Sequence, residues 1–180
     1  LLLGLRRPHD WVVLKPSAIE AAIASLRAGF RHVVADVTAE FEGEDLTGSI
    51  DVEERNALAR IAVTEADTVV AVGVDGLKGV RDLVRLLDDL AAMHVAPSRI
   101  VPVVTRAPRD RAGRAAVTKA VADLCGMPPD LSPVFIPTHR RIEAHLRCAD
   151  PLPPTLTRPV GRAVAAIAEL DGRTLAGALS

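Results

Sequence analysis

The sequence is poor in aromatic residues. Its 180 residues include one Trp, three Phe and no Tyr. Binding platforms for single-stranded nucleic acid stack bases on several aromatic rings, and this chain has too few to build one. The net charge of −1 is also too small to attract nucleic acid or an anionic membrane by bulk electrostatics. The composition therefore predicts an aliphatic core and no sequence-specific nucleic-acid partner.

Cysteine and long apolar runs are scarce as well. Cys125 and Cys148 lie far apart, and neither belongs to a CxxC motif, so no disulfide framework is indicated. The longest apolar runs fall far short of the ~20 residues that a membrane-spanning helix needs. These absences predict a cytoplasmic protein with no transmembrane segment, able to reach a membrane only peripherally through a partner.

Three chemical motifs are missing. No Gly-Lys dipeptide occurs, so the chain contains no P-loop, and no G-x-S-x-G motif marks a hydrolase nucleophile. His139, His145 and Cys148 are close in sequence, but a fourth zinc ligand is not evident. Solvated or capping histidines are the better interpretation of this group.

The residues that are present alternate between apolar runs and amphipathic stretches. This order implies βαβ units and a doubly wound, mainly parallel sheet with helices on both faces, in an α/β fold. Without a convincing linker, residues 1–180 are predicted to form a single domain. The expected strands are Trp11–Leu14, His32–Ala35, Thr68–Val74, Ile100–Val104 and Val134–Ile136.

Local signals give further detail. Ser17 and Glu20 have the spacing of a capping box at the start of a helix. Pro102 lacks a ladder donor, which would place its strand near a sheet edge or at a bulge. The clearest amphipathic helix follows the third expected strand, and its apolar set is Val80, Leu83, Val84, Leu86, Leu87 and Leu90.

An acidic stretch follows the second expected strand. The apolar run His32–Ala35 ends in Asp36, and four more carboxylates follow by Asp45. Ligands of open α/β sheets gather at the carboxyl ends of the strands, where a carboxylate can hold hydrated Mg²⁺ or orient a water. By itself, however, the stretch favours a plainer interpretation, a strand that runs into a solvated acidic loop.

Two other loops are candidates for ligand contact. In the segment Gly73–Gly79 the glycine spacing fits neither a P-loop nor G-x-G-x-x-G, although Gly76 and Gly79 lie where a helix N-terminus could face a ligand. The basic loop could bind a phosphate, an acidic partner or a second subunit, although a solvated loop is the commoner outcome. Its arginines are Arg106, Arg109, Arg111 and Arg114.

Several segments, in order along the chain, resemble the part of a MinD/ParA-type ATPase that follows its P-loop, and most closely the members related to the pilus-assembly ATPase CpaE. Val33–Val37 (VVADV) resembles the Walker B segment, with Asp36 as its terminal acid. Ala66–Leu87 resembles the strand and helix after switch II. Ile100–Arg109 is similar to the strand that ends near the adenine, and Val134–Pro154 to the family's strand, short helix and turn after it.

The resemblance implies a P-loop NTPase-like fold and a nucleotide-dependent switch in positioning, partitioning, or pilus or secretion-apparatus assembly. ATP and Mg²⁺ would bind at the carboxyl ends of the strands, two subunits would sandwich the nucleotides as a homodimer, and a protein partner would read the state. Asp36 would hold the Mg²⁺ shell or orient the attacking water. The adenine would be bound by Thr105, Arg106, Ile136, Pro137 and Thr138, the last three through backbone groups.

The sequence also departs from the family. The P-loop is absent, the Asp-x-Pro after Walker B reads Asp36-Val37-Thr38, and Thr105 replaces the usual Asn. Without a P-loop, catalysis by this chain alone is not expected. Two explanations remain open. Either a P-loop is encoded upstream of Leu1, which a start at Leu rather than Met favours, or the chain is a non-catalytic α/β protein-binding module that keeps the fold and has lost hydrolysis.

Overall fold

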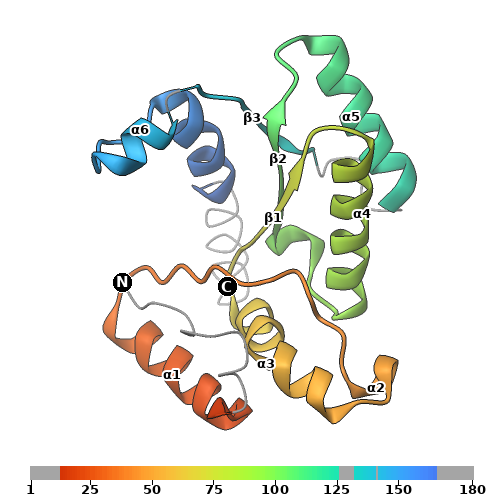
Figure 1. Ribbon diagram of the computed structural model, residues 1–180, viewed down its shortest axis with the longest axis vertical. Coiled ribbons are helices and arrows are strands. Elements are labelled where there is room, and N and C mark those ends of the chain that lie inside the picture. The colour runs from red at the N-terminus through yellow and green to blue at the C-terminus, as the bar shows by residue number, and fades with distance from the viewer. Residues whose placement is uncertain (1–12, 126–131, 141, 166–180) are drawn as a thin grey trace, which may run out of the picture. The chain divides into compact units, whose positions relative to one another are not determined.

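The computed structural model describes residues 13–125, 132–140 and 142–165. The chain divides into two compact units, Leu1–Ala66 and Asp67–Ser180, which are described separately below. The sheet and the helices that flank it belong to the second unit (Figure 1). That the chain is a single domain stays a prediction.

The second unit is built on a three-stranded sheet in which all strands are parallel, in the order β1-β2-β3. Val69 pairs with Ile100, and Val103 pairs with Val134. The runs of β-branched residues that predicted these three strands fit a pleated, buried surface, and the predictions are confirmed. The bounds are β1 Val69–Val74, β2 Ile100–Ala107 and β3 Val134–Pro137.

Pro102 is tolerated for a different reason from the one expected. β2 lies between β1 and β3, so it is neither an edge strand nor bulged at Pro102. However, pairing with β3 begins only at Val103, so at Pro102 the strand is paired on the β1 side alone. At this level β3 has not yet begun, so the missing N–H of Pro102 costs no hydrogen bond between β2 and β3.

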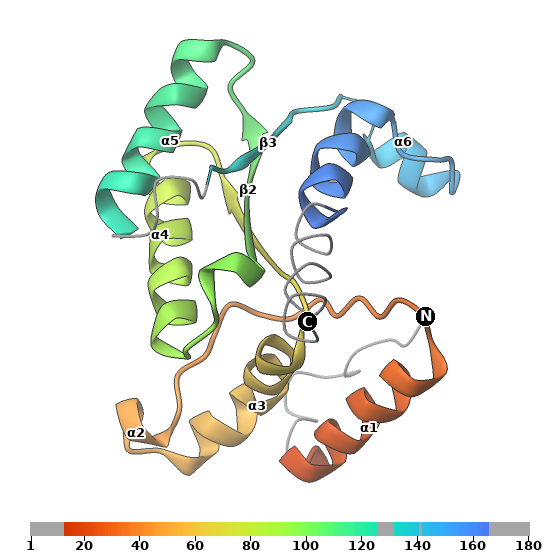
Figure 2. The same ribbon diagram turned by 180° about the vertical axis from the view of Figure 1, so that it is seen from behind.

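One face of the sheet is covered by α4 (Leu77–Ala92), and α5 (Arg111–Cys125) packs against α4 (Figures 1 and 2). A short 3-10 turn, Pro97–Arg99, leads into β2. The apolar set predicted for α4 is buried except for Leu86, which is half-buried. The buried members are close together because residues at this spacing share one helix face. They are Val80, Leu83, Val84, Leu87 and Leu90.

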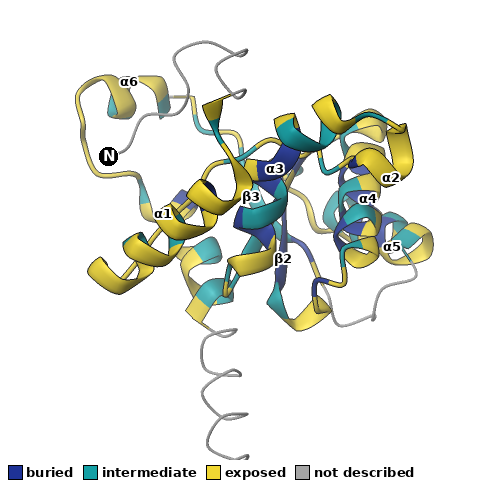
Figure 3. Ribbon diagram, turned by 90° about the horizontal axis from the view of Figure 1, so that it is seen from below, coloured by how far each residue is buried: buried dark blue, intermediate teal, exposed yellow. Residues whose placement is uncertain are grey.

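The other face of the sheet is covered only in part. Val101 and Val103 of β2 are buried there against Val160 and Ala163, which belong to a helix at residues 154–165. The expected helices on both faces are therefore present in this unit. β2 is buried over most of its length (Figure 3). On β1 the same face remains accessible, since Val70, Val72 and Val74 are 40%, 54% and 42% exposed.

The first unit is helical, with α1 (Pro16–Gly29), a short α2 (Glu44–Thr47) and α3 (Ile50–Glu65). The capping box predicted at Ser17 is wrong, because α1 begins one residue earlier with Pro16 in its first turn and Lys15 at the N-cap position. Proline suits this position because its missing N–H would be unpaired there in any case.

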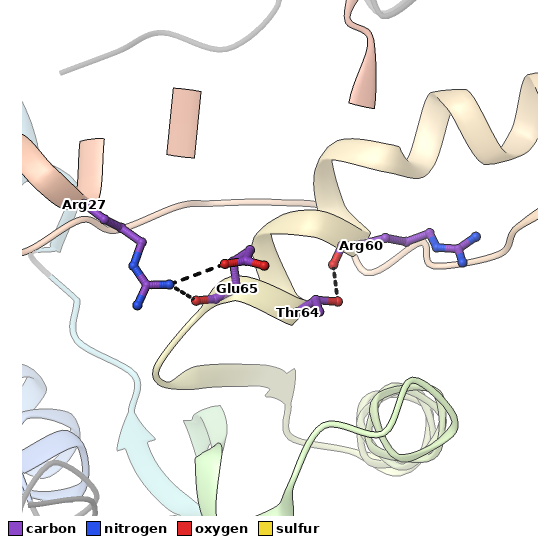
Figure 4. Close-up of polar contacts among 4 residues, drawn as sticks. All are labelled: Arg27, Arg60, Thr64 and Glu65. Atoms are coloured by element: carbon purple, nitrogen blue, oxygen red, sulfur yellow. Dashed lines mark hydrogen bonds and ion pairs between the residues drawn. The ribbon is translucent and has the colours of Figure 1, made fainter. Parts of the chain in front are cut away.

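Contacts between α1 and α3 tie this unit together (Figure 4). Arg27 Nη1 donates to the carbonyl oxygen of Glu65 at 2.5 Å and lies 3.6 Å from its carboxylate. Both side chains are about half exposed, so the ion pair itself contributes only ~0–1 kcal/mol. Within α3, Thr64 donates to the carbonyl oxygen of Arg60. The buried Asn56 of α3 donates to the carbonyl oxygen of Glu42, which precedes α2, at 2.9 Å.

The strand predicted at His32–Ala35 is wrong. These residues belong to no strand, and Val34 is 93% exposed. An apolar, β-branched run becomes a strand only where a neighbouring strand accepts its hydrogen bonds, and no described strand pairs with this one. The expected strand Trp11–Leu14 lies partly outside the described residues; Val13 and Leu14 are not in a strand.

α6 (Ile142–Arg147) follows β3 and matches the short helix expected at this point. None of the helices in the described ranges is both long enough and apolar enough to cross a bilayer.

Candidate functional site

A cavity of about 350 Å³ opens where β2 and β3 end. β3 ends at Pro137, and Thr138 and His139 continue the chain along the cavity wall. The loop after β2, the first turn of α5 and the start of the helix at residues 154–165 complete it. The lining residues are Arg109, Arg114, Pro137, Thr138, His139, Thr155 and Leu156.

Two of the five residues predicted to bind the adenine, Pro137 and Thr138, line this cavity. Thr105 and Ile136 do not line it. Ile136 directly precedes Pro137, and Thr105 is the register partner of Ile136 in the sheet. The Thr105 hydroxyl donates to the Gly73 carbonyl oxygen at 2.9 Å, so it ties β2 to β1 and does not point to a free ligand position.

Arg106 occupies an irregular position in β2. The register with β3 shifts between Thr105 and Ala107, and Arg106 has a left-handed φ of 53°. A bulged residue leaves the regular ladder and turns its side chain away from the strand's alternation. Arg106 is exposed and does not line the cavity, so its predicted place beside the adenine stays a prediction.

The two arginines of the cavity are held differently. Arg114 Nε donates to the Pro108 carbonyl oxygen at 2.8 Å, and its guanidinium lies 5.7 Å from the centre of the Phe135 ring. These contacts orient a half-buried side chain before any ligand arrives. Arg109, on the loop before α5, is exposed.

His139 adds a polar atom that the protein itself does not satisfy. Its Nδ1 is buried and has no hydrogen-bond partner in the described part of the chain, and the same is true of His145 Nδ1. The two rings lie 5.7 Å apart, centre to centre. Cys148, considered with them as a zinc ligand, is exposed, and in the described ranges no group of three or more His, Cys, Asp or Glu side chains could hold a metal ion.

Asp36, the predicted Walker B acid, belongs to the first unit and is exposed in the extended segment that precedes α2. Because His32–Ala35 is not a strand, Asp36 does not stand at the carboxyl end of one. Among the described residues, Asp36 belongs to no group of three or more His, Cys, Asp or Glu side chains that could hold a metal ion. Nothing in this arrangement fits a complete Mg²⁺ site, and no metal-dependent step is derived from it.

The glycine-rich loop after β1 serves packing more than ligand binding. A Cβ added to Gly79 would lie 2.0 Å from the Val74 carbonyl oxygen, so this glycine allows α4 to approach the end of β1. Gly76, the residue before α4, has φ 103°, a conformation that glycine adopts without strain. A Cβ there would meet nothing within 4 Å, so among Gly73, Gly76 and Gly79 the open surroundings are those of Gly76.

Sequence reasoning missed the role of His139 and Thr155 in the cavity. His139 was weighed only as a zinc ligand, and Thr155 follows a run of prolines that carries no ligand-binding signal. Neither spacing nor composition predicts that they meet Arg109 and Arg114. Comparison with protein-family models, with curated proteins and with solved structures finds no match.

Proposed function

We propose that this chain carries the base side of the nucleotide site in a MinD/ParA-like switch ATPase of the P-loop NTPase class. The cavity at the carboxyl ends of β2 and β3 is the observation that carries the proposal, because Pro137 and Thr138 line it. Two of the five residues that the family resemblance implies for the base therefore border a concavity of ligand size, at the end of a parallel sheet where ligands usually bind.

The described residues fit the two parts of ATP unequally. Thr138 directly follows β3, is exposed and lines the cavity proposed for the base. No P-loop supports the phosphates, because the sequence has no Gly-Lys, and Gly79, after β1, is packed against Val74. Nucleotide binding is therefore proposed for these residues, and no hydrolytic step follows from them.

Competition between nucleosides tests the base site. Adenosine should displace a fluorescent ATP analogue from the protein, and guanosine should do so less well. Thr138→Pro removes one backbone N–H and should weaken adenosine binding about tenfold, the equivalent of one hydrogen bond. Thr138→Ala keeps that N–H and is the matched control. Failure of adenosine to compete, or equal binding by the proline variant, would contradict the base site.

Asp36 enters the proposal as the Walker B acid. In the full gene product, Asp36→Asn should lower ATP turnover and leave adenosine binding unchanged, because the carboxylate would act on Mg²⁺ or water and not on the base. Glu40→Gln, in the same acidic stretch, is the matched control. Unchanged turnover in the Asp36 variant would remove Asp36 from this role.

As a switch, the protein would form a homodimer through bound nucleotide and present it to a protein partner in a positioning, partitioning, or pilus or secretion system. Light scattering with and without ATP and Mg²⁺ measures the first part of this behaviour. The expected result for the full gene product is a doubling of mass with ATP that ADP does not reproduce.

A second function, a non-catalytic protein-binding module, is favoured by one specific observation. Val70, Val72 and Val74 expose an apolar row on β1. Such a row on a sheet face is characteristic of surfaces that bind other proteins. For this function ATP should cause no change in mass, so the same light-scattering measurement decides between the two.

A further inference from the structure

Among the described residues, the cavity at the ends of β2 and β3 is lined by hydrogen-bond donors of positive or neutral charge and by no carboxylate. Its polar side chains are Arg109, Arg114, Thr138, His139 and Thr155.

The two arginines of the cavity retain N–H donors that a ligand could use. Arg114 uses only Nε in its bond to Pro108, which leaves the N–H groups of both terminal nitrogens. In the described part of the chain neither Arg109 nor Arg114 forms an ion pair. Guanidinium groups that lack a carboxylate partner and line a concave site are suited to a bidentate anion such as phosphate.

The unsatisfied imidazole points to the same chemistry. A buried polar atom without a partner calls for an explanation, and the ring of His139, which carries such an Nδ1, lines the cavity. With Nδ1 buried and unpaired, the donor that the neutral ring would offer to an anion in the cavity is its Nε2–H. Thr155, in the first turn of the helix at residues 154–165, adds a hydroxyl beside a helix end whose partial charge is positive.

We propose that this cavity binds a small anionic ligand through a phosphate-type group, held by Arg109 and Arg114 with His139 as a further donor. A volume of about 350 Å³ suits a small molecule better than the flat acidic surface of a protein partner. The inference concerns the same cavity as the proposed base site but does not rest on it, because it depends on Arg109 and Arg114, which an uncharged adenine does not need.

Titration of the ¹⁵N-labelled protein with inorganic phosphate tests the proposal, with sodium chloride at matched ionic strength as the blank. The expected result is saturable shifts of the amide signals of Thr138, His139 and Thr155. Arg109→Gln should weaken phosphate binding roughly tenfold, since a charged hydrogen-bonding partner is lost. The exposed Arg109 makes no described contact that the fold needs, so this variant should fold normally.

Matched variants and probes separate the alternatives. Arg111→Gln removes an equal charge two residues away, at the start of α5 and outside the cavity lining, and should change phosphate binding by less than about twofold. Arg114→Gln should resemble Arg109→Gln. Equal losses in the Arg111 and Arg109 variants, or shifts with chloride alone, would show non-specific attraction and overturn the proposal.

Two further results would also overturn it. One is an absence of phosphate shifts together with saturable shifts from an acidic peptide such as penta-glutamate, which would assign the arginines to a protein partner. The other is adenosine binding with no phosphate binding, which would support the proposed base site alone. Phosphate binding that depends on Arg109, without adenosine binding, would support this inference and contradict the base site.

Discussion

Gly79→Ala tests how closely α4 is packed against β1. In an exposed helix this change would stabilise the protein by ~1 kcal/mol, because alanine has the higher helix propensity. Here the new Cβ would lie 2.0 Å from the carbonyl oxygen of Val74 and 2.7 Å from its carbonyl carbon. Both are backbone atoms of β1, so no side-chain rotation relieves the overlap.

The expected magnitude follows from these distances. Real Cβ atoms essentially never come within 3.0 Å of such neighbours, so α4 or the end of β1 must move by about 1 Å. Overpacking of this kind costs ~1–3 kcal/mol, and a rigid backbone neighbour places the cost at the upper end. After the gain in helix propensity, Gly79→Ala should lower the free energy of unfolding by ~2 kcal/mol.

Urea denaturation followed by far-UV circular dichroism measures this change. Gly161→Ala is the matched control, because Gly161 is also helical and a Cβ there would meet nothing within 4 Å. The control should raise the free energy of unfolding by ~0.5–1 kcal/mol. A Gly79→Ala protein as stable as the wild type, or more stable, would refute the packing of α4 on β1 described here.

Three further changes test other parts of the structure. Leu87→Ala should destabilise the protein by ~2–5 kcal/mol in the same urea assay, because the Leu87 side chain is fully buried and its truncation leaves a cavity. Asn56→Ala should cost ~1–3 kcal/mol, since it leaves the carbonyl oxygen of Glu42 without its buried donor; Asn56→Asp, which also removes the donor, should be no better. Burial, and then the nearby Asp88 carboxylate, raise the pKa of the Cys125 thiol from 9.0 to about 11. Because the unfolded chain loses this proton first, the stability that the neutral thiol contributes is complete below pH 9 and is lost as the pH rises to about 11. Urea titrations across that window should show a fall that Cys125→Ser reduces, and an equal fall in the serine variant would contradict the shift.

The parts of the fold that local patterns predict are those whose evidence is contained in one segment. The apolar set of α4 repeats at helical spacing, and five of its six members are buried. The runs at Thr68–Val74 and Val134–Ile136 are rich in β-branched residues and flanked by turn residues, and each contains a strand over all or nearly all of its length. In each case the pattern of side chains within the segment predicts the element, whatever segments pack beside it.

His32–Ala35 shows why the same reasoning fails elsewhere. Its composition resembles that of β1, but it pairs with no strand, and Val34 is 93% exposed. A strand depends on hydrogen bonds to a neighbour, and the neighbour is a property of the whole fold. The role predicted for Asp36 depended on that strand, so the sequence could propose the residue and could not provide its surroundings.

The sequence by itself determined that this protein is α/β, that its core is aliphatic, and that residues near the end of β3 are candidates for ligand contact. Only the tertiary structure decided that Arg109 and Arg114 meet His139 and Thr155 around one cavity. These residues come from separate segments, and no local pattern encodes their distance. Their proximity arises because parallel strands end at the same edge of the sheet and carry the loops that follow them to one place.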